Sequence, residues 1–139
     1  MTGPYHRGLL KNQSNIKVFY GINEVLKKLS YCNILAIITS NETVVVENFL
    51  KANKINCFQE IIGSDKGLSK IEKIRMIQSK YPNSIYYYIG DTKGDILEGK
   101  IAGINTVAVT WGWHDKDKLV KERPKHIVHS PNELLNLFD

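Results

Sequence analysis

The sequence predicts a single α/β domain built around a mostly parallel sheet. Continuous apolar runs of strand length alternate along the chain with segments of helical periodicity. Glycine, proline and asparagine fall between these segments, where turns are expected. The length of 139 residues and the hydrophobic content of 42% suffice for one globular domain with its own core.

Two helices and a strand account for the first part of this pattern. A helix is expected from Gly21, because apolar residues recur after it at helical spacing. Residues 34–38 form an apolar run, the pattern of a strand buried on both faces of a sheet. Asn41 follows this strand and is predicted to be the N-cap of a second helix. The inward-facing residues predicted for the two helices are Ile22, Val25, Leu26 and Leu29, then Val45, Val46, Phe49 and Leu50.

The same alternation continues to the end of the chain. Pro82 ends a predicted helix, Gly103 ends another, and Pro131 occupies the first position of the last one. Strands that alternate with helices favour a parallel sheet over an antiparallel one. Strands are expected at residues 58–62, 85–89, 106–110 and 126–129, and helices at residues 69–81, 94–102, 115–122 and from 131 onward.

Two carboxylates follow the predicted strand at residues 85–89. Asp91 and Asp95 are four residues apart across a strand-to-helix turn, and ligands bind beyond the carboxyl ends of strands in open parallel sheets. Oxygen donors at this place suit Mg²⁺, which takes one or two protein carboxylates and keeps several waters. The alternative is structural: Asp95 stabilises the helix N-terminus and Asp91 caps the turn.

Residues that could bind an anion occur at two other places, one at the end of a predicted strand and one at the start of a predicted helix. Thr39, Ser40 and Asn41 follow the strand at residues 34–38, and their hydroxyls and N–H groups at a helix N-terminus would cradle a phosphate. An ordinary N-cap is the alternative. Lys70 stands where a loop enters a helix, a place that is unfavourable for a cation unless an anion lies nearby. A surface lysine is the alternative there.

These features occur in the order of motifs II, III and IV of the haloacid dehalogenase (HAD) superfamily. The chain resembles the phosphoglycolate phosphatase-like members of that superfamily over nearly its whole length, from about Ile16 to Phe138. The resemblance implies a Rossmannoid three-layer sandwich as the fold. The similar stretches are residues 21–29, 61–65 and 91–103, the loop Trp111-Gly112-Trp113, and the ending at residues 130–135.

The resemblance also implies a role for each candidate residue. Thr39 would hydrogen-bond the transferring phosphoryl group, and Lys70 would neutralise the charge of the nucleophile and the phosphate. Family members usually have a proline after this lysine, whereas Ile71 follows here, so Lys73 is a second candidate for the role. The predicted site has Thr39 and Lys70 as catalytic residues, the same two with Ser40 and Asn41 as phosphate ligands, and Asp91 and Asp95 at the Mg²⁺.

The nucleophile of the family has no counterpart in this chain. Family members attack phosphate with an aspartate of an Asp-x-Asp motif on an N-terminal strand, whereas no acidic residue precedes Glu24 here. We therefore expect a chain truncated at its N-terminus, with the first motif and the cap domain absent. The sheet would lack its first, central strand, and the gap would favour self-association. Residues 1–15 would be a tail or cap remnant, and residues 16–139 a partial core domain.

The predicted function is a Mg²⁺-dependent phosphate monoester hydrolase domain that acts on a small phosphorylated metabolite and is inactive as this chain alone. The alternative is a catalytically inactive HAD-like module that binds Mg²⁺ and phosphate or a protein partner. A receiver-like, doubly wound binding domain is a third reading. It explains the sheet and the acidic pair, but not Thr39 and Lys70 in register with Asp91.

Composition and charge also bear on the binding partners and the location of the protein. The net charge is +5, but the lysines are dispersed and no arginine-rich arm occurs, so no nucleic-acid partner is expected. No apolar run approaches the roughly 18 residues of a membrane span, and no apolar signal segment follows the first residues. Cys32 and Cys57 lack metal-site spacing and are expected to be buried, reduced thiols, which favours a cytoplasmic location.

Overall fold

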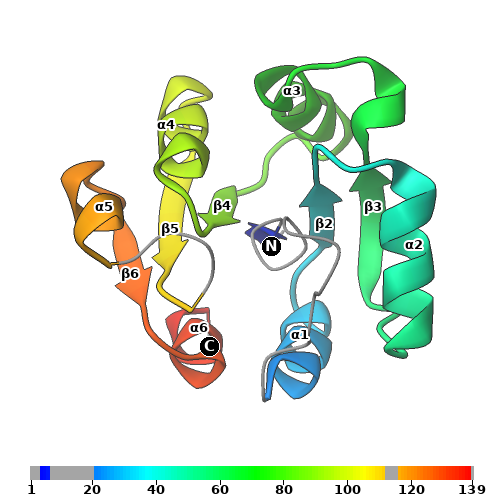
Figure 1. The fold of residues 1–139 in the computed structure, drawn as a ribbon, viewed down its shortest axis with the longest axis horizontal. Coiled ribbons are helices and arrows are strands. Elements are labelled where there is room, and N and C mark those ends of the chain that lie inside the picture. Colours follow the sequence, from blue (N-terminus) through cyan, green and yellow to red (C-terminus); the bar gives the residue numbers. More distant parts are fainter. Residues whose placement is uncertain (1–3, 7–20, 112–115, 139) are drawn as a thin grey trace.

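Six parallel strands form the central sheet of the computed structural model, which describes residues 4–6, 21–111 and 116–138. Their order across the sheet is β3-β2-β1-β4-β5-β6 (Figure 1). Every neighbouring pair is parallel, which confirms the predicted sheet. The strands are β1 (Pro4–His6), β2 (Leu35–Ile38), β3 (Phe58–Ile62), β4 (Tyr87–Gly90), β5 (Asn105–Val109) and β6 (His126–Val128).

The helices of the described residues are α1 (Ile22–Ser30), α2 (Thr43–Ala52), the short 3-10 helix η2 (Ser64–Lys66), α3 (Lys70–Lys80), α4 (Lys93–Ile101), α5 (Lys116–Lys121) and α6 (Pro131–Leu137). Leu35 packs with α1 and α6, and Ile37 packs with α2 on the same face of the sheet. Ala36 and Tyr88 pack with α3 on the opposite face, and Ala108 packs there with α4 and α5. In Figure 1, α1 and α6 lie together at the lower side and α3 and α4 at the upper side. The three-layer sandwich is thus confirmed.

The central position of the sheet is filled by β1, so the prediction of a missing central strand is wrong. Tyr5 pairs with Ala36 of β2 and with Tyr88 of β4. This strand comes from the segment that the sequence analysis assigns to a tail. Backbone groups of β2 and β4 that face the gap need hydrogen-bond partners, and even a short segment without an apolar run can supply them. Self-association stays a prediction, but an unfilled strand position is no longer its reason.

The predicted apolar faces agree with the structure except in α2. All four predicted residues of α1 are buried. In α2, Val46 and Leu50 are buried, whereas Val45 is 43% exposed. The N-cap position is Glu42, not Asn41, because the Asn41 amide is used elsewhere: its Nδ2 donates to Thr39 Oγ1 at 3.2 Å. The helix therefore begins one residue later than predicted, and both Val44 and Val45 are exposed.

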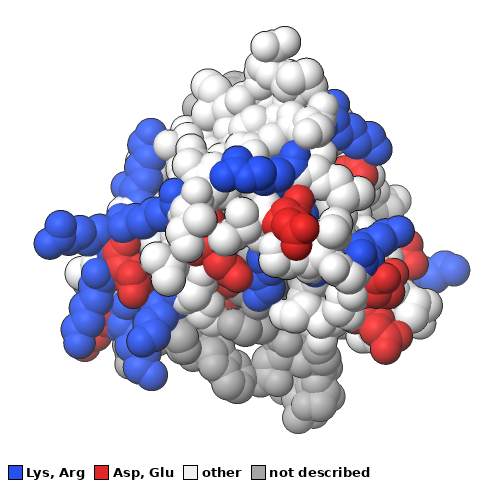
Figure 2. Space-filling model, turned by 90° about the horizontal axis from the view of Figure 1, so that it is seen from above, with Lys and Arg blue, Asp and Glu red and all other residues white. Residues whose placement is uncertain are grey.

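Surface features add two observations to the sequence analysis. Cys32 is exposed and Cys57 is half-buried, so the prediction of two buried thiols is wrong for Cys32. Seen from above in Figure 2, basic side chains form several separate groups with acidic ones between them. None of the helices in the described part of the chain combines the length and hydropathy needed to cross a membrane.

Candidate phosphate and metal site

Thr39 is the first residue after β2 and forms the centre of a tight turn. It is buried, and its N–H donates to the carbonyl of Ile62 at 3.1 Å. Its Oγ1 accepts hydrogen bonds from the N–H of Asn41 at 3.1 Å and from Asn41 Nδ2 at 3.2 Å. A threonine hydroxyl also has one hydrogen to donate, so the Thr39 side chain can offer an O–H to a phosphate oxygen. Ser40, next in the turn, is exposed.

The lysine that contacts this turn is Lys73. Its Nζ donates to the carbonyl of Thr39 at 2.9 Å, and the side chain is only 2% exposed. Lysines are seldom buried this deeply unless the ammonium is hydrogen-bonded or paired. Lys70, to which the sequence analysis gave the role, occupies the first position of α3 and is half-buried. The structure therefore shows Lys73, the second candidate, in contact with the turn, and the role of Lys70 stays a prediction.

Two sets of contacts stabilise α3, the helix that carries the buried Lys73. At the start of the helix, Glu72 N–H donates to Ser69 Oγ at 3.1 Å and Ser69 N–H donates to Glu72 Oε1 at 2.9 Å. This capping box lowers the pKa of Glu72, chiefly through the hydrogen bond from the Ser69 backbone. At the end of the helix, Glu60 of β3 accepts hydrogen bonds from Lys80 at 2.6 Å and from the Tyr81 hydroxyl at 2.9 Å. The capping box defines where α3 begins, and the Glu60 contacts hold its end against β3.

The turn after β4 brings Asp91 and Asp95 into contact. Asp95 Oδ2 accepts the N–H groups of Asp91 at 3.1 Å and of Thr92 at 3.2 Å. Thr92 Oγ1 accepts the N–H of Asp95 at 3.1 Å, so Thr92 is the N-cap of α4. Gly90 permits this arrangement, because a Cβ at that position would lie 2.3 Å from Asp95 Cβ. Asp95 thus shapes the turn, and the N-cap of α4 is Thr92 rather than Asp91.

The donor set at this turn fits Mg²⁺ through one direct carboxylate. Asp91 is 2% exposed and lies directly beyond the carboxyl end of β4. Asp95 fits as a support, because its Oδ2 already orients the backbone on which Asp91 stands. Mg²⁺ commonly binds to one or two protein carboxylates and retains waters at the other positions. Among the described residues there is no group of three or more His, Cys, Asp or Glu side chains that could enclose a metal.

The two halves of the site lie at the same edge of the sheet. β2 and β4 flank β1, so Thr39 and Asp91 follow strands that are two positions apart (Figure 1). At the usual spacing of strands, this separation is roughly 10 Å. A phosphate group and a metal ion fit between side chains at that distance. The structure therefore places Thr39, Lys73 and the Asp91–Asp95 pair at one edge of the sheet.

The helical spacing of the sequence points to Lys73 as a buried residue of α3. Residues 70, 73, 74 and 77 fall on one face of the helix, and Ile74 and Ile77 on that face are buried. A lysine within an apolar face requires a hydrogen-bond acceptor for its ammonium group, and here the carbonyl of Thr39 is that acceptor. Of the two tryptophans in the aromatic loop, Trp111 packs against the core on the α1 side, and Trp113 lies outside the described residues.

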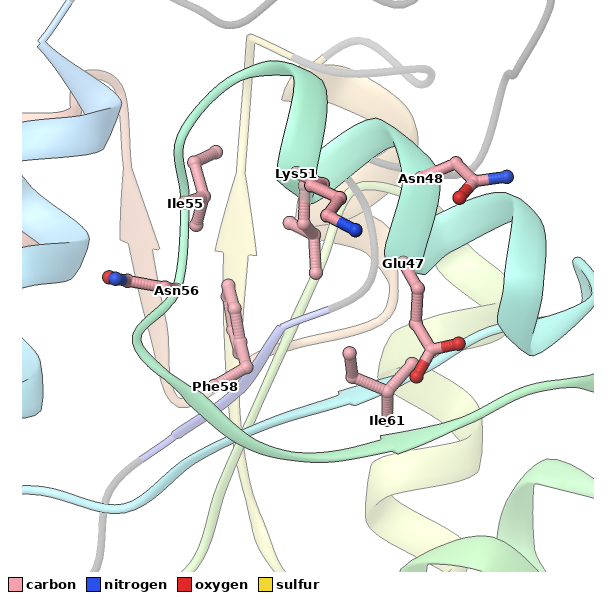
Figure 3. Close-up of a pocket in the computed structure, with 8 residues that line it drawn as sticks. Glu47, Asn48, Lys51, Ile55, Asn56, Phe58 and Ile61 are labelled. Carbon is pink, nitrogen blue, oxygen red and sulfur yellow. The ribbon is translucent and has the colours of Figure 1, made fainter.

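A cleft of about 480 Å³ lies between α2 and β3, apart from the site. Figure 3 shows Glu47, Asn48 and Lys51 on the helix side, with Phe58 and Ile61 on the strand side. None of the predicted site residues lines it. It is a groove at the edge of the sheet, because β3 is the outermost strand, and we assign it no role in phosphate binding.

Comparisons with a family model and with known proteins point to the same family. A sequence model described as haloacid dehalogenase-like hydrolase matches residues 5–109. A phosphoglycolate phosphatase from Synechococcus elongatus is 28% identical over 126 residues, which cover 86% of this chain and 58% of the relative. A phosphoglycolate phosphatase from Pasteurella multocida is 25% identical, with 93% of this chain and 61% of the relative covered.

Solved structures agree with the sequence comparisons. A haloacid dehalogenase-like family hydrolase from Streptococcus pneumoniae superimposes with a TM-score of 0.78 at 29% identity, covering 88% of this chain and 60% of that one. A predicted phosphatase from Clostridium acetobutylicum superimposes with a TM-score of 0.77 at 29% identity, covering 87% of this chain and 59% of that one. The chain spans about three-fifths of the length of these relatives.

Proposed function

Since the chain belongs to the haloacid dehalogenase-like hydrolase family, we propose that it is the phosphate- and Mg²⁺-binding core of a phosphate monoester hydrolase. The proposed substrate is a small phosphorylated metabolite, as for the phosphoglycolate phosphatases that the chain resembles. One observation carries the proposal. The buried Lys73 contacts Thr39 after β2, and the buried Asp91 follows β4 at the same edge of the sheet.

The turn after β2 would hold the phosphoryl group. Thr39 would donate its O–H to one phosphate oxygen, and Ser40 and Asn41 stand beside it in the turn. The Lys73 ammonium has three donors, one of which goes to the Thr39 carbonyl, and its charge lies next to the place where the anion would bind. Charge-assisted hydrogen bonds of this kind are roughly twice as strong as neutral ones.

The turn after β4 would hold Mg²⁺. Asp91 would be the direct ligand, with Asp95 supporting its backbone through the two N–H bonds. The ion, when bound, would offset negative charge on the phosphoryl oxygens. Because Asp91 is only 2% exposed, its carboxylate is largely screened from bulk water, and its attraction for a cation is stronger than at an exposed position.

The 139-residue chain is expected to bind these ligands without hydrolysing phosphate esters. The family nucleophile is an aspartate, and no acidic residue precedes Glu24 in this chain. Positioning and charge stabilisation survive the loss of a nucleophile, but the covalent step does not. The second candidate function is an inactive module of this family that binds Mg²⁺ and phosphate, and the two candidates differ in whether the protein hydrolyses phosphate esters.

Titration calorimetry with inorganic phosphate and MgCl₂, together with hydrolysis of p-nitrophenyl phosphate, tests the proposal. We expect phosphate binding that strengthens with Mg²⁺, and no hydrolysis above background. Absence of both binding events would contradict the proposed site. Hydrolysis by the purified chain that is lost in Asp91→Ala would contradict the inactive module. Peptides of the native protein from its source cells give a further test. If they include an Asp-x-Asp motif, the native protein carries the family nucleophile and is expected to be an active phosphatase.

Replacing Lys73 with methionine is expected to weaken phosphate binding by about tenfold, because a charged donor leaves the turn while its volume is kept. Lys70→Met is the matched control on the same helix and removes the same charge. Calorimetric titration of both variants with phosphate measures the difference. A larger loss in Lys70→Met than in Lys73→Met would return the role to the lysine that the sequence analysis selected.

A further inference from the structure

Two neighbouring loops meet at the proposed phosphate site. We call residues 39–41 the phosphate turn and residues 63–65, which follow β3, the clamp loop. Their backbones touch: a Cβ at Gly63 would lie 2.4 Å from the Thr43 nitrogen and 2.6 Å from the Asn41 oxygen. Only glycine fits at this distance, because backbone atoms cannot move aside as a flexible side chain can.

A closed set of hydrogen bonds joins the two loops. Asp65 Oδ1 accepts from the N–H and from the hydroxyl of Thr43, each at 2.7 Å. The same Thr43 hydroxyl oxygen accepts the N–H of Gly63 at 3.0 Å. Ser64 N–H donates to the carbonyl of Asn41 at 2.8 Å. The clamp loop thus contacts the last residue of the phosphate turn and the first residue of α2.

Asp65 caps the N-terminus of α2, although it lies outside that helix. Glu42 occupies the N-cap position but forms no side-chain capping bond, and the first turn of α2 contains no acidic residue. The carboxylate that satisfies the Thr43 N–H comes from 22 residues away in the sequence. Bonds from the Thr43 hydroxyl, and then from its backbone N–H, lower the pKa of Asp65. The carboxylate therefore persists at pH values where an ordinary aspartate is protonated.

We infer that Asp65 is a positioning residue for phosphate binding, acting through Thr43 on the phosphate turn. Thr39 and Asn41 must present a hydroxyl and N–H groups in one geometry, and they stand only two to four residues before Thr43. Without the carboxylate, the start of α2 loses an acceptor and the turn is tied to β3 by fewer bonds. This inference rests on the proposed function.

Phosphate titrations of Asp65→Ala and Thr43→Val in the full chain test the inference. Both variants are expected to bind inorganic phosphate about tenfold more weakly, since a charge-assisted network is opened. The two losses should not add in the double variant, because both changes open the same network. Thr43→Ser, which keeps the hydroxyl, should restore binding to near the wild-type value. Asp117→Ala, an exposed residue of α5, controls for the change in net charge.

Mg²⁺ affinity separates positioning from general damage. Asp91 lies on a different turn, so Asp65→Ala should leave Mg²⁺ affinity unchanged while phosphate affinity falls. A parallel loss of both affinities, with a lower melting temperature, would show a merely structural role and overturn the inference. Equal phosphate affinity in wild type and Asp65→Ala would overturn the inference alone. A wild-type chain that binds no phosphate would overturn the proposed function as well.

Discussion

Replacing Asp91 with asparagine is expected to weaken Mg²⁺ binding by at least about a hundredfold, because the change removes the charge of the only direct carboxylate ligand that we propose. The substitution keeps the size of the side chain, so the turn between β4 and α4 is retained. Calorimetric titration with MgCl₂ measures the affinity directly. In wild type, Mg²⁺ should also raise the melting temperature, since a ligand that binds only the folded state stabilises it.

The control for Asp91→Asn is Asp117→Asn, which removes the same charge from an exposed position in α5. Its Mg²⁺ affinity should equal that of wild type. Melting curves without Mg²⁺ show whether each variant is folded. A folded Asp91→Asn variant that binds Mg²⁺ as wild type does would place the metal elsewhere, and the assignment of this turn would be wrong.

Replacing Gly90 with alanine is expected to lower the free energy of unfolding by about 2–3 kcal/mol through overpacking. The added Cβ would lie 2.3 Å from Asp95 Cβ and 2.7 Å from Asp95 Oδ2. Asp95 cannot move away cheaply, because its Oδ2 accepts the N–H groups of Asp91 and Thr92. Urea unfolding of the variant and the wild type measures the difference.

Gly94→Ala is the matched control in the same segment. Gly94 lies in the first turn of α4, and a Cβ there would be 3.7 Å from its nearest neighbour, an ordinary contact. Alanine is favoured over glycine within a helix, so this variant should be as stable as wild type or more stable by up to about 1 kcal/mol. If Gly90→Ala unfolds at the same urea concentration as wild type, the close packing of Asp95 against Gly90 is not rigid.

Most helices and strands were predictable, because their signals are local. The run at residues 34–38 predicted β2, and helical spacing from Ile22 to Leu29 predicted α1 with all four buried residues. The exception is β1. Its three residues carry no apolar run, and what holds them as a strand is the pairing with β2 and β4. Because this strand forms only between two strands that are distant in the sequence, the three residues themselves carry no strand signal.

Long-range contacts also explain where the structure of the candidate site differs from the sequence-based predictions. Asn41 has the chemistry of an N-cap, but Asp65 reaches α2 from the next loop, and Asn41 bonds to Thr39 instead. Lys70 matched the family order, yet the rotation of α3 against the sheet brings Lys73 to the Thr39 carbonyl. Residue type could not reveal the cap of α2, and the apolar face of α3 indicated that Lys73 is buried but not which group it contacts. Both contacts depend on how one element packs on another.

The sequence by itself determined the α/β class, the order of the strands and α-helices from α1 onward, and the residue types at the carboxyl ends of β2 and β4. Those features follow from apolar periodicity and from contacts within a few residues, such as the Thr92–Asp95 capping box. Only the tertiary structure decided which strand fills the centre, which lysine meets the phosphate turn and which carboxylate caps α2. These choices join residues far apart in the sequence: 22 positions for Asp65 and Thr43, 34 for Lys73 and Thr39, and the span from Tyr5 to Tyr88 for the central strand. They are set by the packing of whole elements rather than by local preference.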